Sequence, residues 1–228
     1  NIEQVSSNLE VVSNIEQVSS NLEVVSNIEQ VVIFTNNVLD GDGNIMKLQN
    51  YEAVRRYTMN LFLNTDDKVL ELGGGYGFLT VFANKTCNVY TVVEPNSNMW
   101  SVLEQNKTNT GSTFNIIKGF LAKRPMGFGE SGPDENSTVP YFTELPQESN
   151  TLIADCEGGL TYFFDDFPEA FDQFNKIFMD EDGDYESLKE SLVKNGFYKM
   201  FNHSDFTGLV YSVWIKTPCE CIQQEILI

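Results

Sequence analysis

The sequence contains the segment Val69-Leu-Glu-Leu-Gly-Gly-Gly-Tyr-Gly-Phe-Leu-Thr80, in which a glycine-rich turn separates two apolar stretches. Gly73, Gly75 and Gly77 fall at this turn, where glycine can adopt positive φ angles and lets a ligand approach the backbone. A helix beginning there presents free N–H groups to the same point. Glu71 lies near the carboxyl end of the preceding strand, where open parallel sheets bind ligands. The segment therefore predicts a strand–turn–helix unit with a ligand site at its turn.

The next predicted strand ends in Val93-Glu94-Pro95-Asn96, about twenty residues after the first glycine. An acid at this position can accept hydrogen bonds from both hydroxyls of a ribose. A dinucleotide site would need a glycine at position 78, where this chain has Phe78, and no Walker lysine follows. Gly77 instead completes the pattern acid-x-Gly-x-Gly-x-Gly, whose spacing resembles the S-adenosylmethionine site of class I methyltransferases. A glycine-rich turn that binds no ligand is the alternative.

Strand and helix patterns alternate along the rest of the chain. Such alternation implies right-handed crossovers and a largely parallel sheet, and two closing strands without a helix between them suggest an antiparallel strand at the edge. The predicted fold is a doubly wound, mostly parallel seven-stranded α/β sheet of the Rossmann-like methyltransferase type. The predicted strands are 68–72, 88–93, 114–118, 151–155, 176–180, 197–201 and 209–216, and the predicted helices are 49–64, 78–85, 98–108, 168–174 and 185–195, with a long loop over 122–150.

The charge of the chain argues against polyanionic partners. Asp and Glu total 33 against 14 Lys and Arg among 228 residues, a net charge of −19. Nucleic acids and anionic membrane surfaces attract Lys and Arg, so neither is predicted to be a partner. The apolar runs are too short to span a bilayer, and no signal peptide is visible. Four cysteines without CxxC spacing indicate reduced thiols, so the protein is predicted to be cytoplasmic.

The N-terminal residues form an internal repeat. The segment NIEQVSSNLEVVS occupies residues 1–13, recurs unchanged at 14–26 and begins a third time at Asn27. Its apolar residues are spaced by threes and fours, which favours an amphipathic helix that packs on the domain or on a partner, including a second copy of the chain. A poorly ordered arm is the alternative. The predicted organisation is an arm over 1–38, a methyltransferase domain over 39–218 and a tail over 219–228.

Further motifs occur in an order that resembles FkbM-type methyltransferases. They are Val93-Glu-Pro-Asn96, Leu103-Glu-Gln-Asn106, Asn115-Ile-Ile-Lys-Gly119, Leu152-Ile-Ala-Asp-Cys-Glu-Gly-Gly159 and Asn195-Gly-Phe197. The resemblance covers about residues 50–216 and leaves the repeat outside. It implies an enzyme that transfers a methyl group from S-adenosylmethionine to a hydroxyl oxygen of a small molecule, sugar or glycan.

The same resemblance implies which residues hold the cofactor. They are Glu71, Gly73, Gly75 and Gly77 for the methionine part, Glu94 for the ribose, Gly119 and Phe120 for the adenine, and Asn96 and Asp155 as further contacts. Asp155 and Glu157 would also face the acceptor.

Methyl transfer requires an acceptor oxygen aligned with the methyl carbon and a group that removes its proton. Glu157 and Asp155 are the candidate bases, and because two close carboxylates repel, one pKa is expected to rise. Either could instead cap the following helix. His203, in a predicted loop between the last two strands, is the alternative base or an exposed bystander. Asp155 and the acidic run 180–182 could bind Mg²⁺, but such clusters are usually solvated, so no metal site is predicted.

Two other functions fit the same patterns. A catalytically inactive methyltransferase-like domain, kept as an assembly module and joined through the repeat arm, would show no heat on titration with S-adenosylhomocysteine. An NAD-dependent oxidoreductase is disfavoured by the residue at position 78, which is Phe78 rather than glycine.

Overall fold

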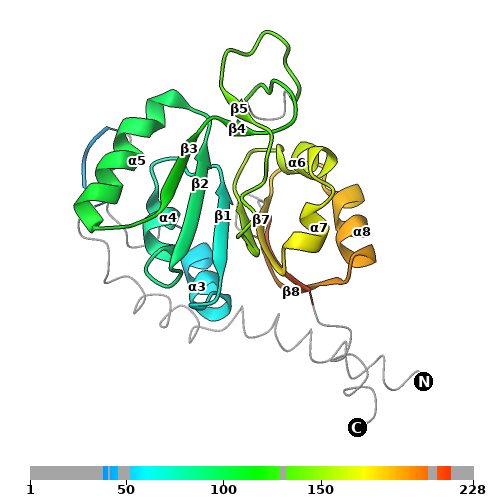
Figure 1. Ribbon diagram of the computed structural model, residues 1–228. Coiled ribbons are helices and arrows are strands. Elements are labelled where there is room, and N and C mark those ends of the chain that lie inside the picture. Colours follow the sequence, from blue (N-terminus) through cyan, green and yellow to red (C-terminus); the bar gives the residue numbers. More distant parts are fainter. Residues whose placement is uncertain (1–37, 41, 46–51, 129–131, 205–209, 217–228) are drawn as a thin grey trace.

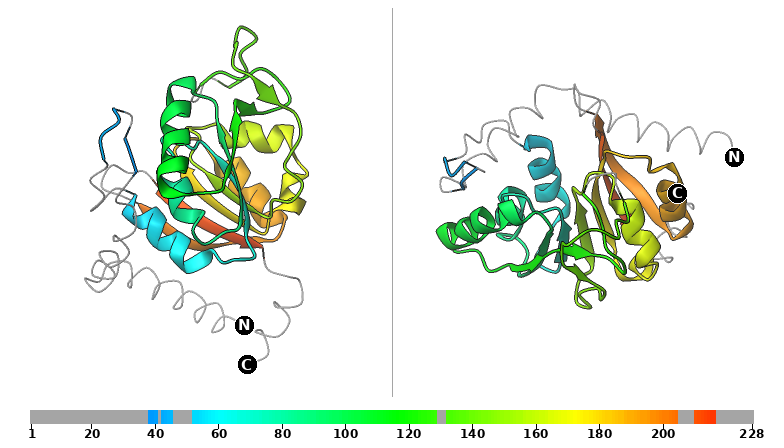
Figure 2. Two further views of the ribbon diagram at one scale, coloured as in Figure 1. Left: turned by 60° about the vertical axis from the view of Figure 1, so that its left-hand side comes forward. Right: turned by 90° about the horizontal axis from the view of Figure 1, so that it is seen from above.

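The computed structural model describes residues 38–40, 42–45, 52–128, 132–204 and 210–216. Within them, a seven-stranded sheet lies between two layers of helices (Figure 1, Figure 2). The repeat predicted as an arm over 1–38 lies outside the described residues except for its last position, and the tail predicted over 219–228 lies outside them entirely. Both assignments therefore stay predictions.

The large sheet confirms the predicted doubly wound α/β fold. Its strands, in spatial order, are β3 (Asn115–Lys118), β2 (Val89–Glu94), β1 (Lys68–Leu72), β6 (Thr151–Ala154), β7 (Lys176–Glu181), β9 (Val210–Lys216) and β8 (Phe197–Ser204). The first five pair in parallel, and β9 runs antiparallel to both of its neighbours. The antiparallel member of the closing pair is thus β9, which lies between β7 and the edge strand β8.

The strand pleat divides the core into two halves. On one face, Val69 of β1 belongs to a cluster with residues of α3 (Ala53–Phe62), α4 (Phe78–Ala83) and α5 (Ser97–Thr110). On the other face, Leu70 and Leu72 belong to a cluster with residues of α6 (Leu160–Asp166), α7 (Ala170–Gln173) and α8 (Glu186–Lys194). Successive strand residues point to opposite faces, so a nearly continuous apolar strand serves both layers.

The structure adds two features that the sequence pattern does not predict. Helix α6 was not predicted. The helix predicted over 168–174 is shorter than expected, because only the four residues of α7 are helical. The predicted loop over 122–150 contains β5 (Tyr141–Phe142), which pairs in parallel with β4 (Phe120–Leu121). This two-stranded sheet forms a lobe next to the carboxyl ends of the large sheet's strands (Figure 1).

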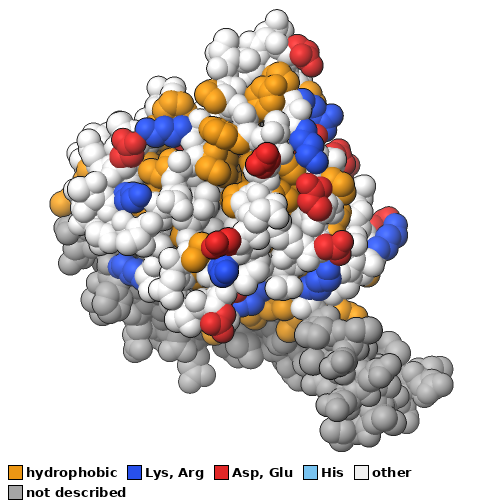
Figure 3. Space-filling model, viewed as in Figure 1, with side chains coloured by type: hydrophobic (Ala, Val, Ile, Leu, Met, Phe, Trp, Pro, Cys, Tyr) orange, Lys and Arg blue, Asp and Glu red, His pale blue; other side chains and the backbone are white. Residues whose placement is uncertain are grey.

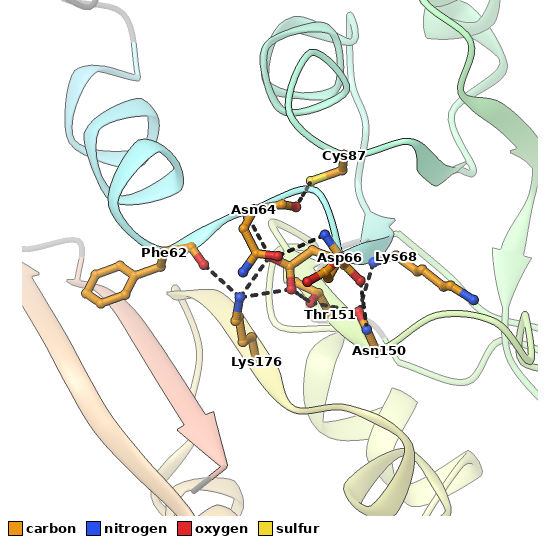
Figure 4. A network of polar contacts seen from close by, with 9 residues as sticks. Phe62, Asn64, Asp66, Lys68, Cys87, Asn150, Thr151 and Lys176 are labelled. Atoms are coloured by element: carbon orange, nitrogen blue, oxygen red, sulfur yellow. Dashed lines mark hydrogen bonds and ion pairs between the residues drawn. The ribbon is translucent and has the colours of Figure 1, made fainter.

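A polar network joins α3 to the sheet at the opposite, amino edge of the strands (Figure 4). The Lys176 ammonium donates to the Phe62 carbonyl oxygen at 2.8 Å and to both carboxylate oxygens of Asp67 at 2.8 and 2.9 Å. The Thr151 hydroxyl donates to Asp67 Oδ1 at 2.8 Å. These contacts secure β1, β6 and β7 at one end and leave their carboxyl ends for the cavity described next.

Candidate functional site

The sheet has its topological switch point between β1 and β6, because the chain builds outward from β1 to β2 and β3 and then returns to the other side of β1. Open α/β sheets bind ligands outside the carboxyl ends of their strands at such a point. A cavity of about 470 Å³ lies there, within the range of about 300–1,000 Å³ typical of small-molecule sites. Of the predicted site residues, Gly73, Gly75, Glu94, Asn96, Phe120, Asp155 and Glu157 line it.

The glycine turn forms one wall of the cavity. Gly73 has φ +85°, and a Cβ there would lie 1.8 Å from the carbonyl oxygen of Asp155, so only glycine lets the ends of β1 and β6 approach this closely. Gly75 has φ +51°, and a Cβ there would meet no atom within 4 Å. The turn at Gly75 therefore borders open space, as a ligand cradle requires.

Glu94 lies at the carboxyl end of β2, directly against this turn. Its Oε2 accepts a hydrogen bond from the Gly75 N–H and its Oε1 from the Asn96 N–H, both at 2.6 Å. The residue is only 5% exposed, and burial raises the pKa of its carboxyl although both backbone hydrogen bonds oppose the rise. Each carboxylate oxygen has a second lone pair. The arrangement can therefore accept hydrogen bonds from two neighbouring hydroxyls of a ligand.

The Glu71 side chain does not line the cavity. It is buried on the α4 face of β1, where its Oε2 accepts hydrogen bonds from the hydroxyls of Thr80 and Tyr90. Burial raises the pKa of Glu71 to about 7. Strand alternation accounts for this placement, because Leu70 and Leu72 occupy the other face. Glu71 supports the turn from beneath it.

Of the remaining predicted cofactor contacts, some line the cavity and others lie behind its lining. Gly77 is the N-cap of α4 and lies outside the cavity lining. The Gly119 N–H donates to the carbonyl oxygen of Glu94 at 3.1 Å, which brings Phe120 to the cavity wall. The Asn96 side chain caps α5 by accepting from the Asn98 N–H at 3.1 Å.

Asp155 and Glu157 both line the cavity after β6, in different environments. Burial is the main cause that raises the pKa of Asp155, and Asp182 and Glu157 raise it further while Arg55 opposes. The expected pKa rise thus falls on Asp155, but burial rather than repulsion is its main cause. Glu157 is exposed, and within the described residues its side chain makes no hydrogen bond or ion pair. Its φ of +48° is left-handed, a strain that gathers at functional sites.

Arg55 of α3 is a site residue that sequence reasoning missed. Its guanidinium bonds Asp155 Oδ2 at 3.0 Å, Glu52 Oε2 at 2.5 Å and, through Nε, Asp180 Oδ1 at 2.9 Å. A second nitrogen of the same guanidinium forms an ion pair with Asp180. The side chain is 11% exposed. The only signal in the linear sequence is the Glu52–Arg55 spacing of three, because the other partners are 100 and 125 positions away.

The acidic run 180–182, which was weighed with Asp155 as a Mg²⁺ ligand set and not predicted as one, is divided among separate partners. Asp180 pairs with Arg55, and Glu181 pairs with Lys189 and Lys199. Asp182 accepts hydrogen bonds from the Gly158 N–H at 3.0 Å and the Tyr185 hydroxyl at 2.7 Å. Among the described residues, no group of three or more His, Cys, Asp or Glu side chains is arranged to hold a metal ion.

The placement of His203 in a loop was wrong. Strand β8 continues to Ser204, and His203 pairs with Tyr211 of β9 near the edge of the sheet. The extension follows from the partner, since β9 offers backbone groups along its whole length. His203 is half-buried and does not line the cavity. The structure therefore does not bring this candidate base to the site.

No protein-family model matches the chain, and no curated protein matches it. Solved structures do match. A candidate RNA methyltransferase from Pyrococcus horikoshii is 13% identical with a TM-score of 0.56, over 85% of this chain and 98% of that one. A ribosomal protein L11 methylase from Lactobacillus delbrueckii subsp. bulgaricus is 11% identical with a TM-score of 0.53, over 76% and 81%.

A third similar structure is a precorrin-6y C5,15-methyltransferase from Geobacter metallireducens, which is 13% identical with a TM-score of 0.53, over 82% of this chain and 98% of that one. At such identities the likeness shows the fold alone, which is the Rossmann-like fold of class I S-adenosylmethionine-dependent methyltransferases.

Among the helices in the described part of the chain, none combines the length and the apolar character that a membrane span needs.

Proposed function

We propose that this chain is an S-adenosylmethionine-dependent methyltransferase that methylates a hydroxyl oxygen of a small molecule or glycan. The observation that carries the proposal is the pairing of Glu94 with the Gly75 turn in the lining of the switch-point cavity. A carboxylate held there by two backbone N–H groups matches the two hydroxyls of a ribose. The fold shared with known methyltransferases supports the same assignment.

The charge of the cavity also suits this cofactor. The carboxylates in its lining are those of Glu94, Asp155, Glu157 and Asp166, and none of the described lining residues is Lys, Arg or His. Such a lining favours a cation, and S-adenosylmethionine carries its reactive methyl group on a positively charged sulfur. When bound, the cofactor supplies that methyl group to the acceptor.

The residues of the chain then orient the acceptor and take up its proton. Methylation of an acceptor hydroxyl would release the hydroxyl proton, which a group of the chain would have to take up. We assign the proton to the Glu157 carboxylate, which is exposed at the cavity and has no other partner among the described residues. Asp155, held by Arg55, is assigned to positioning.

The finer assignment to O-methylation follows the resemblance to FkbM-type enzymes in the motifs after β2, β3 and β6. Two of the similar structures are named for RNA and for a ribosomal protein as substrates. The net charge of −19 argues against RNA as the acceptor here. We therefore retain a small molecule or glycan as the proposed acceptor class.

Titration calorimetry with S-adenosylhomocysteine tests the proposal. The chain offers a matched pair of variants, Gly75→Leu and Gly111→Leu, because both glycines have positive φ angles and open space for a Cβ. Both variants carry the same left-handed strain of about 1–2 kcal/mol, but only Gly75 lines the cavity. We expect the wild type and Gly111→Leu to bind and Gly75→Leu to lose binding. A folded wild type that shows no binding heat would instead indicate the inactive assembly module.

A further inference from the structure

We infer that the acceptor is an apolar aromatic molecule without negative charge, bound against Phe128 and Tyr162 beside Glu157. This inference rests on the proposed methyl transfer and narrows its acceptor class, because it favours an aromatic ring over a glycan.

The part of the cavity lining that comes from the segment after β3 and from helix α6 is mainly aromatic and apolar. Phe120 and Phe128 lie on the segment that begins with β4, and their ring centroids are 5.4 Å apart. Tyr162 and Phe163 of α6 line the cavity as well. Phe128 is 51% exposed, although it borders a cavity. Hydrophobic side chains gather on this face of the molecule beneath the lobe of β4 and β5 (Figure 3).

The backbone that carries Phe128 is held against α6. The Gly127 N–H donates to the carbonyl oxygen of Gly132 at 2.8 Å, and Met126 forms an antiparallel bridge with Pro133. Gly132 lies so close to α6 that a Cβ there would be 2.6 Å from the Tyr162 hydroxyl oxygen. The aromatic wall is therefore preformed, which limits the ordering cost of binding a flat ligand.

The charges around this wall oppose an anionic acceptor. The lining contains four carboxylates, and none of its described residues is Lys, Arg or His. The carboxylate of Asp166 is compensated, since it accepts from the Lys123 N–H at 2.8 Å and pairs with Arg124 at 2.6 Å. Glu157 has no such partner among the described residues. A carboxylate or phosphate group on the acceptor would face these acids without a compensating cation in the lining.

The polar capacity of the wall also disfavours a sugar. The Asp166 carboxylate is held by the Lys123 N–H and the Arg124 guanidinium, and the Asn96 side-chain oxygen caps α5, so both polar groups are already directed toward the protein. A sugar placed against Met126, Phe128 and Phe163 would bury hydroxyls without partners, which is unfavourable. An aromatic ring would instead gain favourable contacts with the protein rings it meets. The acceptor hydroxyl is assigned to the Glu157 carboxylate, which lines the same cavity.

A matched set of ligands tests this inference by titration calorimetry into protein saturated with S-adenosylhomocysteine. The set is 4-methylphenol, tyramine, 4-hydroxybenzoate, methyl β-glucoside and a single-stranded RNA oligonucleotide. The first three share a phenol and differ in charge. We expect 4-methylphenol and tyramine to bind at millimolar concentration, 4-hydroxybenzoate to bind at least about tenfold more weakly, and the glucoside and the RNA not to bind.

Two variants test whether the Phe128 ring contacts the bound phenol. Phe128→Ser is expected to weaken 4-methylphenol binding at least about fivefold, since it removes a ring worth on the order of 1 kcal/mol, and to weaken S-adenosylhomocysteine binding less, because the predicted adenine contact is its neighbour Phe120. Phe142→Ser is the matched control, because Phe142 is an exposed aromatic of the same lobe that does not line the cavity. The inference is overturned if 4-hydroxybenzoate or the glucoside binds as tightly as 4-methylphenol, if no phenol binds, or if Phe128→Ser has no effect. If the wild type did not bind S-adenosylhomocysteine, the proposed function itself would be wrong.

Discussion

Replacing Glu94 by Gln tests the residue on which the proposed cofactor site depends. Its two carboxylate oxygens each accept one backbone N–H at 2.6 Å, one from Gly75 and one from Asn96. An amide can accept at only one of these positions, because its NH₂ group is a donor. In Glu94→Gln, one backbone N–H would therefore face another donor at a site that is almost fully buried.

The size of the effect follows from these contacts. A hydrogen bond to a charged acceptor contributes about 1.5–3 kcal/mol, so we expect Glu94→Gln to lower the free energy of unfolding by about 2 kcal/mol. The same loss of charge weakens any bond from a ribose hydroxyl. Since about 1.4 kcal/mol corresponds to a tenfold change in affinity, we expect S-adenosylhomocysteine to bind roughly 10- to 100-fold more weakly.

Titration calorimetry measures the affinity, and urea unfolding measures the stability of the same preparation. Glu104→Gln is the control, because Glu104 lies on the following helix and its ion pair with Lys118 is exposed; such pairs contribute about 0–1 kcal/mol. The pH dependence gives a second measurement. Burial raises the pKa of Glu94. As the pH is lowered, the affinity of the wild type for S-adenosylhomocysteine should therefore begin to fall at a higher pH than it would with an ordinary glutamate, because the carboxylate takes up a proton.

The Gln variant should not show that decline. The reasoning would be refuted if folded Glu94→Gln bound S-adenosylhomocysteine within about threefold of the wild type, since the carboxylate would then have no part in holding the nucleoside.

Three further predictions concern the residues around this site. Glu157→Gln is expected to lower kcat with a phenolic acceptor by about 10²–10⁴-fold while S-adenosylhomocysteine affinity holds; an unchanged rate would remove Glu157 as the base. Arg55→Met leaves the carboxylates of Glu52, Asp155 and Asp180 without their shared cation, so unfolding in urea should show a loss of about 3–5 kcal/mol, against at most about 1 kcal/mol for the exposed control Lys118→Met; equal losses would contradict a buried network. Because burial raises the pKa of Glu71 from 4.5 to about 7, its contribution to stability is present at acid pH and is lost as the pH rises through about 7. Between about pH 5 and pH 8, the free energy of unfolding of Glu71→Gln should therefore rise by up to about 3 kcal/mol relative to that of the wild type. If the difference between the two proteins in urea unfolding did not change with pH, Glu71 would not titrate in this way.

The sequence predicts those parts of the site that local chemistry specifies. Gly73 and Gly75 were predicted at a strand-to-helix turn because positive φ angles select glycine. Glu94 was predicted at the end of the next strand, and the right-handed crossover places that strand beside β1. The hydrogen bond between Gly75 and Glu94, which are 19 positions apart, follows from these two rules together.

Other parts depend on which surfaces meet. Glu71 is the acid of the glycine-rich motif, but the pleat of the strand directs its side chain away from the cavity and toward Thr80 and Tyr90. His203 was predicted in a loop, because nothing local shows that β9 offers partners up to Ser204. Helix α6 was missed although its residues form part of the cavity wall, since its aromatic run has the composition of a strand as well as of a buried helix.

The sequence by itself determines the seven strands of the large sheet in chain order, the glycine turn and the acid that faces it, because each depends on the preferences of neighbouring residues along the chain. The guanidinium shared by three carboxylates and the aromatic wall beside Glu157 arise only when the chain has folded. Their members are separated by as many as 125 positions and carry no local pattern, so packing of the two helical layers on the sheet brings them together.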